Sequence, residues 1–271
     1  MDLLVPERRD RILALLKARG RVKVEEIVDE LDVSFTTARR DLRQMHQQGM
    51  VLRTRGGAVL TRPVGYDRPI SQDRELNIEE KDVVGRAATL LIDSGDTIMM
   101  DGGTTTSRVL RHMPDIGIVV VTNCTEVVME AGNKANIEIL LLGGAYLRRH
   151  SCTYGPITER QLQSLRGDKA ILGAAAISVG DGLTDPNALT SQIKVLMSER
   201  CGQTIVVADY SKLGAAMLFA ALPITQVDKL VTDRKADPAI VREFRAAGVE
   251  VIVAEDLLAQ HEQQPGPQTK R

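Results

Sequence analysis

The sequence predicts two joined domains of different class: an N-terminal winged helix-turn-helix (α+β), then a doubly wound parallel α/β domain. Short helix patterns lead into a glycine-tipped ribbon within the first 60 residues. From residue 79 onward, continuous apolar runs alternate with helical patterns, which indicates parallel strands covered on both faces. A chain of 271 residues is long enough for both domains. The predicted divisions are 1–60 and 79–256 for the domains, 61–78 for a linker and 257–271 for a disordered tail.

Composition is that of an ordinary globular protein, with 43% hydrophobic and 26% charged residues. Aromatic residues make up 3% and Trp is absent, so the core is expected to be aliphatic. No apolar run approaches the roughly 18 residues of a membrane helix, and the N-terminus lacks the order of a signal peptide. A cytoplasmic location is therefore expected. Cys124, Cys152 and Cys201 have no metal-binding spacing, which predicts reduced, mostly buried thiols.

Charge is distributed unevenly along the chain. Residues 1–62 hold 13 Lys+Arg against 9 Asp+Glu, a net charge of +4, and the remainder carries −5 because the whole chain carries −1. A basic head on an acidic body favours a nucleic-acid partner for the head.

The head reads as three helices and a ribbon. Pro6 opens the first helix and Gly20 ends it; a short strand at 21–24 and a second helix at 25–31 follow. Ser34 is expected to cap a third helix that runs to about Gln47. Two short strands, at 51–53 and 58–60, then form a wing around a glycine turn.

One face of the third helix is apolar and the other carries threonine and arginine. Arginine donates bidentate hydrogen bonds to guanine or binds phosphate, and threonine contacts thymine methyl groups or phosphates. Asp41 is the one acid there and is expected to hold a neighbouring arginine or the helix start. The alternative is a solvated charged face without a ligand. The predicted DNA-binding residues are Ser34, Phe35, Thr36, Thr37, Arg39, Arg40, Arg43, Arg53 and Arg55.

This head resembles the DeoR family of bacterial transcription regulators. The resemblance rests on SFTTARRDL at 34–42, GMV at 49–51 and RGGAVL at 55–60. It implies a recognition helix whose contacts include Thr36, Arg39 and Arg40, and a wing in which Arg55 stands where many members have His.

The segment 61–78 holds two prolines and a glycine without periodicity, which predicts an extended connection. A short helical turn is expected at 71–75, and Asn77 is expected to cap the next helix.

The body predicts a parallel sheet whose strands end in polar residues. Helices are expected from about residue 79 and at 238–247, and strands at 98–100, 118–122, 137–142, 170–173, 204–208, 229–232 and 250–253. Ligands of such sheets bind beyond the carboxyl ends of the strands.

The stretch 97–107 reads as strand, glycine turn and helix N-terminus, which suits a phosphate; the alternative is a plain turn. Similar polar endings recur along the body, and two lysines follow, which together suit a phosphorylated polyhydroxy compound. These predicted effector-binding residues are Asp101, Gly102, Gly103, Thr104, Thr105, Thr106, Thr122, Asn123, Gly143, Gly144, Lys194, Asp209 and Lys212.

The body resembles the DeoR-type sensor domain, which is similar in fold to ribose-5-phosphate isomerase. The resemblance rests on DGGTTT at 101–106, TN at 122–123, LGG at 142–144, YGP at 154–156, GLT at 182–184 and ADYSK at 208–212. It adds Thr184 and Asp185 to the expected effector site.

Two departures from the family pattern bear on function. The family usually reads A-D-G-I-D where this chain has Ala174–Ser178, so both carboxylates are absent. The related isomerases place catalytic acids in that region, and their absence argues against isomerase chemistry. The run 188–192 also lacks the glutamates that the family often has, which leaves the effector undetermined.

The expected function is therefore a DNA-binding transcriptional regulator, a repressor of a carbohydrate catabolic operon. A phosphorylated sugar, sugar acid or polyol is expected to modulate its operator affinity, with no cofactor and no metal. A helix-turn-helix that reads a palindrome predicts at least a dimer. The alternatives are a sugar-phosphate isomerase with an attached nucleic-acid module, and a constitutive DNA-binding protein with a ligand-free body.

Overall fold

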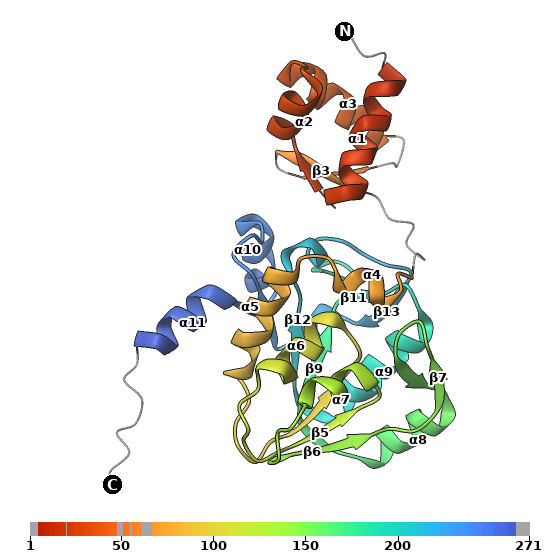
Figure 1. Ribbon diagram of the computed structural model, residues 1–271, viewed down its shortest axis with the longest axis vertical. Helices are drawn as coiled ribbons and strands as arrows, with labels where there is room; N and C mark the ends of the chain where they lie inside the picture. The colour runs from red at the N-terminus through yellow and green to blue at the C-terminus, as the bar shows by residue number, and fades with distance from the viewer. Residues whose placement is uncertain (1–4, 20, 48–50, 55, 61–66, 264–271) are drawn as a thin grey trace. The chain divides into compact units, whose positions relative to one another are not determined.

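The computed structural model (Figure 1) describes residues 5–19, 21–47, 51–54, 56–60 and 67–263. The chain divides into two compact units, Met1–Pro63 and Val64–Arg271. In the described stretches no helix is long and apolar enough to cross a membrane.

The first unit is a winged helix-turn-helix, as predicted. Its helices are α1 (Val5–Arg19), α2 (Val24–Leu31) and α3 (Phe35–Gln47), and its strands are β1 (Arg21–Lys23), β2 (Val51–Thr54) and β3 (Gly57–Leu60). The strands form an antiparallel sheet in the order β1-β3-β2. The apolar stripe of α3 is buried against the other two helices, and Asp41 on its inner face pairs with Arg8 of α1. Asp41 thus fixes α3 to α1, which confirms a structural role for this acid.

The second unit is built on a seven-stranded, all-parallel sheet in the order β15-β14-β12-β9-β4-β5-β6. The predicted strands are all present. They are β4 (Thr97–Met100), β5 (Ile118–Thr122), β6 (Ile137–Leu141), β9 (Gly167–Gly173), β12 (Cys201–Val207), β14 (Lys229–Thr232) and β15 (Glu250–Val253).

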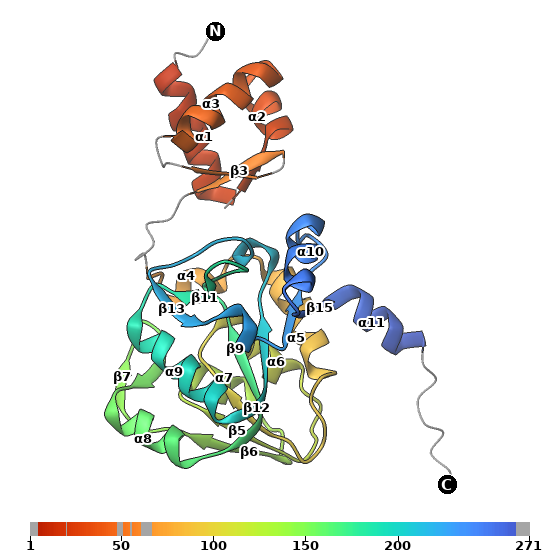
Figure 2. The ribbon, with the colours of Figure 1, turned by 180° about the vertical axis from the view of Figure 1, so that it is seen from behind.

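Helices cover both faces of this sheet. From β4 the crossovers run towards β6 through α6 (Thr104–His112) and α7 (Thr125–Ala131). From β9 they run towards β15 through α9 (Ala188–Glu199) and α10 (Pro238–Ala246). Right-handed crossovers in opposite directions place helices on opposite faces. Helix α5 (Ile78–Thr89) packs beside α6, and α8 (Pro156–Ser164) packs beside α9 (Figures 1 and 2).

Two small antiparallel sheets extend the unit. One joins β10 (Ala176–Ser178), β11 (Gly182–Asp185) and β13 (Phe219–Leu222). The other pairs β7 (Ala145–Leu147) with β8 (Cys152–Tyr154).

Two predictions about the ends of this unit are wrong. Residues 67–78, expected as part of an extended linker, belong to the second unit, although the short helical turn predicted at 71–75 is present as α4 (Ile70–Arg74). Residues 257–263, expected as part of a disordered tail, form the C-terminal part of helix α11 (Ala254–Gln263). This helix forms because Leu257 and Leu258 pack against the core and α11 lies against α5. Residues 61–66 and 264–271 lie outside the described part of the chain.

Candidate functional site

The outer face of α3 carries the predicted DNA-contacting side chains. The Ser34 hydroxyl accepts a hydrogen bond from the Thr37 N–H (3.1 Å), which confirms it as the cap of α3. Phe35 keeps 48% of its surface exposed. Thr36, Arg39, Arg40 and Arg43 are exposed as well, whereas Ala38 and Leu42 face the core.

The three arginines of this face make no ion pairs within the described fold. Among the described residues no acid pairs with Arg39, Arg40 or Arg43. Arg53 lies in β2, and its side chain is outside the described part, as is Arg55 altogether. A helix face with exposed, unpaired guanidinium groups and hydroxyls has the donors that a DNA groove requires.

The second region lies at the carboxyl ends of the parallel strands. Strand order reverses between β4 and β9, and Asp101, directly after β4, accepts a hydrogen bond from the Gly173 N–H at the end of β9 (2.9 Å). Ligands of doubly wound sheets bind at this kind of switch point. The structure therefore brings the stretch DGGTTT to the edge where a ligand is expected.

The predicted residues Asp101, Asp185 and Lys194 form a buried ion cluster there, which we call the buried triad. The Lys194 Nζ lies 2.7 Å from Asp185 Oδ1 and 3.5 Å from Asp101 Oδ2. All three residues are at most 3% exposed. Burial raises the pKa of Asp101 to about 7. The Lys194 charge and the Gly173 N–H lower this pKa but only partly offset burial, and the Asp185 charge raises it. Burial alone lowers the pKa of Lys194, but the two carboxylates outweigh it and raise that pKa.

A second cluster combines Lys81, Thr104 and Lys212, which we call the anion seat. Its donors converge on the Asp73 carboxylate. The Lys81 Nζ and the Thr104 hydroxyl each lie 2.9 Å from Asp73 Oδ2, and the Lys212 Nζ lies 3.2 Å from Oδ1. Lys81 is 1% exposed. Two ammonium groups thus face the Asp73 carboxylate, and the Arg68 guanidinium of the same segment lies 3.4 Å from its Oδ1, so the cations on this carboxylate outnumber it.

The protonation states in the seat follow from these contacts. Burial acts to raise the pKa of Asp73, but the charges of Lys212 and Lys81 and the bonds from Lys81 and Thr104 outweigh it, and the pKa lies well below its usual range. Burial lowers the pKa of Lys81 and the Lys212 charge lowers it further, although Asp73 acts in the opposite direction.

Asp209 lies beside the seat with an open acceptor. Its Oδ1 accepts hydrogen bonds from Asn77 Nδ2 (2.8 Å) and the Ser211 N–H (3.0 Å). Its Oδ2 is buried and makes no hydrogen bond within the described residues. Asn77 lies at the N-cap of α5, as predicted, but its side-chain amide binds Asp209 and makes no capping hydrogen bond to the helix.

Several predicted ligand residues use their polar groups within the fold. Thr106 Oγ1 donates to the carbonyls of Asp101 and Gly103, and Thr122 Oγ1 accepts from the Cys124 N–H. Thr184 Oγ1 accepts from the Met217 N–H, and Thr105 is buried. Asn123 donates to the Thr153 carbonyl, while its Oδ1 is buried without a hydrogen bond among the described residues.

Packing leaves no room for a side chain at Gly102 and Gly144 of the predicted site. A Cβ on Gly102 would lie 2.2 Å from the Cys152 sulfur, so this position has no room for a side chain beside the thiols. The backbones of Cys124 and Cys152 pair here in an isolated antiparallel β-bridge, and both cysteines are free thiols and buried. Gly143 and Gly144 lie against α8: the Gly143 N–H donates to Gln161 (2.8 Å), and a Cβ on Gly144 would lie 2.1 Å from Thr158 Oγ1.

The sequence reasoning missed Lys81 and Asp73. A signal for Lys81 was present, because it falls at helical spacing with Val84 and Ala88 on the buried face of α5, where a lysine needs a partner. No comparable signal marked Asp73, an ordinary acid in a short polar segment.

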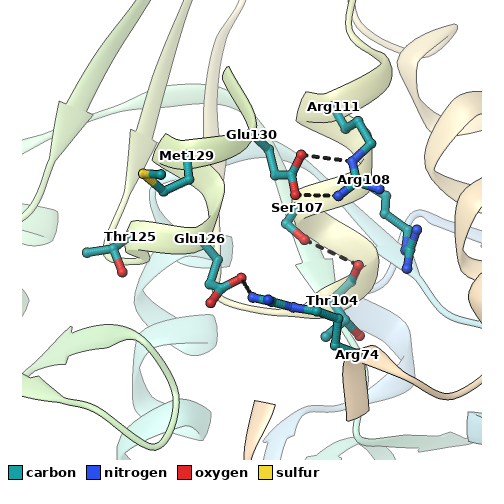
Figure 3. Close-up of a pocket in the computed structure, with 9 residues that line it drawn as sticks. All are labelled: Arg74, Thr104, Ser107, Arg108, Arg111, Thr125, Glu126, Met129 and Glu130. Carbon is teal, nitrogen blue, oxygen red and sulfur yellow. Dashed lines mark hydrogen bonds and ion pairs between the residues drawn. The ribbon is translucent and has the colours of Figure 1, made fainter. Parts of the chain in front are cut away.

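A cavity of about 330 Å³ adjoins the seat between α6 and α7. Thr104 belongs to both. Figure 3 shows Arg74 of α4 reaching Glu126 of α7, and Arg111 of α6 bound to Glu130 of α7. Arg108, also on its wall, pairs with Asp82 of α5 (3.2 Å). The charged side chains on the cavity wall are therefore held in ion pairs.

Together, a winged helix with unpaired arginines and an α/β unit with an anion seat define a DNA-binding regulator with a sensing domain. Residues 8–64 match the family model of the DeoR-like helix-turn-helix domain, and residues 76–234 match that of the DeoR C terminal sensor domain. The chain belongs to the DeoR family of transcriptional regulators.

Characterised relatives align over most of the chain. The transcriptional repressor GlcR of Bacillus subtilis is 35% identical over 251 residues, which cover 92% of this chain and 96% of that protein. The transcriptional regulator GlpR of Haloferax volcanii is 34% identical, with 92% and 98% covered. Among solved structures, the sorbitol operon regulator SorC of Klebsiella pneumoniae has a TM-score of 0.41 and 15% identity, with 90% of this chain and 100% of that chain covered.

Proposed function

We propose that this regulator is a repressor whose DNA affinity is controlled by a phosphorylated polyhydroxy compound, either a sugar, a sugar acid or a polyol. The observation that carries the proposal is the anion seat, in which Lys81, Lys212 and Thr104 converge beside the strand-order reversal. Two ammonium groups and a hydroxyl are the donors that a phosphate group takes. The name of the relative GlcR, a repressor, supports the sign of regulation.

Unpaired buried acceptors support a ligand rich in hydroxyl groups. Asp209 Oδ2 and Asn123 Oδ1 are buried and make no hydrogen bond among the described residues. A buried acceptor without a donor costs about 1–3 kcal/mol, and a bound hydroxyl removes that cost. Donors that suit a phosphate, together with buried acceptors that lack a donor, match a sugar phosphate, acting as an effector and not as a cofactor.

The region that carries catalytic acids in related isomerases supports a binding role. Residues 174–178 supply no carboxylate, and Ser178 at their end donates to Asp181 (2.8 Å). With no acid in this stretch to move a proton next to a carbonyl, the unit holds its ligand without transforming it. We further propose that the protein acts on DNA in the cytoplasm, as at least a dimer, because helix-turn-helix proteins read paired half-sites.

A substitution in α3 tests the DNA-binding part. Arg40→Ala should weaken binding to a duplex selected by the wild-type protein by about 1–3 kcal/mol, because a guanidinium lost from a groove contact costs that much. Fluorescence anisotropy with labelled duplex measures the change. Arg242→Ala, an exposed arginine of α10, is the matched control and should bind as the wild type does. Equal affinities for Arg40→Ala and the control would remove α3 from the interface.

Anisotropy of the same complex also tests the sensing part. A panel of sugar phosphates, sugar-acid phosphates and polyol phosphates is titrated into it, with each unphosphorylated parent as control. At least one phosphorylated compound should release the duplex while its parent has no effect. Indifference to the whole panel would favour a constitutive DNA-binding protein.

A further inference from the structure

The seat already holds an anion, which the chain itself supplies. Asp73 of α4 receives hydrogen bonds from Lys81, Thr104 and Lys212, the donors assigned above to the ligand's phosphate. A carboxylate and a phosphate accept these bonds in the same way, so the two cannot use the same donors at once.

We propose that Asp73 is a tethered competitor of the effector, and that a phosphorylated ligand takes the anion seat only by displacing α4. This inference rests on the proposed function of the seat. It deepens it by assigning the ligand's charge and by naming the segment that moves.

The charges define the class of ligand. Asp73 brings one negative charge to two ammonium groups, whereas a phosphate monoester brings nearly two charges and three acceptor oxygens at neutral pH. A ligand carboxylate offers no more than Asp73 does and lacks the advantage of being attached to the chain. The competitor therefore selects for a phosphate dianion and rejects sugar acids that carry only a carboxylate.

The segment that carries Asp73 is attached in a way that permits displacement. We call residues 67–74 the strap. Every residue of α4 keeps part of its surface exposed, so no buried apolar side chain holds it. Among its described contacts are the Asp67 carboxylate on His150 (2.9 Å), the Ile70 N–H on the Arg149 carbonyl (3.1 Å) and the ion pair of Arg74 with Glu126. Lys81 also donates to the Asp73 carbonyl, so release of the strap uncovers this buried ammonium, but α4 buries no apolar side chain whose exposure would oppose it.

The place of the strap in the chain gives this competition a use. α4 is the first described helix after β3, the last strand of the winged unit. A ligand that binds only when the strap is released shifts the equilibrium towards the released strap. By linkage, a DNA-bound state that favours one strap position changes the affinity for the ligand.

Removal of the competitor tests the proposal directly. Asp73→Ala and Asp73→Asn are made in the full-length chain, with Asp93→Ala as matched control. Asp93 also pairs with a lysine, Lys169, but just before β4 begins, at the opposite edge of the sheet. Isothermal titration with inorganic phosphate, at ionic strength held constant with chloride, measures the affinity. If Asp73 occupies the seat nine-tenths of the time, both Asp73 variants should bind phosphate about tenfold more tightly, and Asp93→Ala should match the wild type. Equal or weaker binding by both Asp73 variants overturns the competitor.

Hydrogen exchange on the wild-type chain provides a second readout that needs no variant. The N–H groups of Ile70, Gln72 and Leu76 are bonded to the Arg149, Pro69 and Asp73 carbonyls. Saturating phosphate should speed their exchange, whereas a ligand that bound over a fixed α4 would slow it or leave it unchanged, and either of those results rejects the displacement.

The two levels of inference fail differently. If Lys212→Ala weakens phosphate binding but the Asp73 variants gain nothing, the seat stands and the competitor falls. If neither the wild type nor the Asp73 variants bind phosphate, the seat itself falls and the competitor falls with it.

Discussion

Two lysine–carboxylate clusters lie at the carboxyl ends of the sheet strands, and they have opposite stoichiometry. The buried triad sets one ammonium, Lys194, between the carboxylates of Asp101 and Asp185. The anion seat sets two ammonium groups, Lys81 and Lys212, around one carboxylate that is 22% exposed on its side chain. A cluster with excess carboxylate has no charge left for an anion, whereas a cluster with excess ammonium does.

The contrast also separates a structural role from a binding role. Asp101, Asp185 and Lys194 come from the β4 turn, β11 and α9, so their contacts tie three elements of the core together. In the seat, the carboxylate comes from α4, which has no buried residue. One cluster is fixed by the packing around it, and the other is completed by a movable part.

The largest expected effect distinguishes the clusters by stability. Lys194→Met leaves two buried carboxylates without their cation and should lower the free energy of unfolding by about 3–5 kcal/mol. Urea denaturation followed by circular dichroism measures it. Lys212→Met leaves Asp73 bound by Lys81, Thr104 and Arg68, so no buried charge is left without a partner, and the loss should be clearly smaller than that of Lys194→Met. Similar losses for both variants would contradict the distinction between the buried triad and the anion seat.

An intermediate effect concerns ligand affinity. Lys212→Ala should weaken the binding of inorganic phosphate by about 1.5–3 kcal/mol, the cost of one charged hydrogen bond, because the seat loses one of its two cations. The variant should still bind operator duplex as the wild type does, since the winged unit is unchanged. Calorimetry and anisotropy on one preparation give both values, and a defect in DNA binding alone would contradict the assignment.

Per unit of pH, the smallest expected effect is the pH dependence of the buried triad. The folded-state pKa of Asp101 is about 7, against a usual value of 3.8, so between these values the folded state binds a proton that the unfolded state releases. Stability from this group is therefore present below about pH 4 and is lost as pH rises towards 7, at no more than about 1.4 kcal/mol per pH unit. Asp101→Asn should flatten this slope in thermal unfolding measured from pH 5 to 8. A slope equal to that of the wild type would show that Asp101 does not carry the proton.

The sequence anticipated the elements better than the partners of each side chain. Continuous apolar runs predicted each strand of the large sheet, and Ser34 predicted the start of α3. The same reasoning placed Gly143 and Gly144 in the ligand site and did not foresee their contacts with α8. It also missed Lys81, whose role depends on Asp73 and on the position of Lys212 far along the chain.

The sequence by itself determined the two kinds of domain, the recognition helix and the parallel sheet, because periodicity and local caps act over a few residues. Only the tertiary structure decided which lysine completes the core and which faces a ligand. Asp73 and Lys212 are separated by 139 positions and meet at one seat. No local pattern encodes such a meeting, because it depends on the strand order of the sheet and on where α4 comes to lie against it.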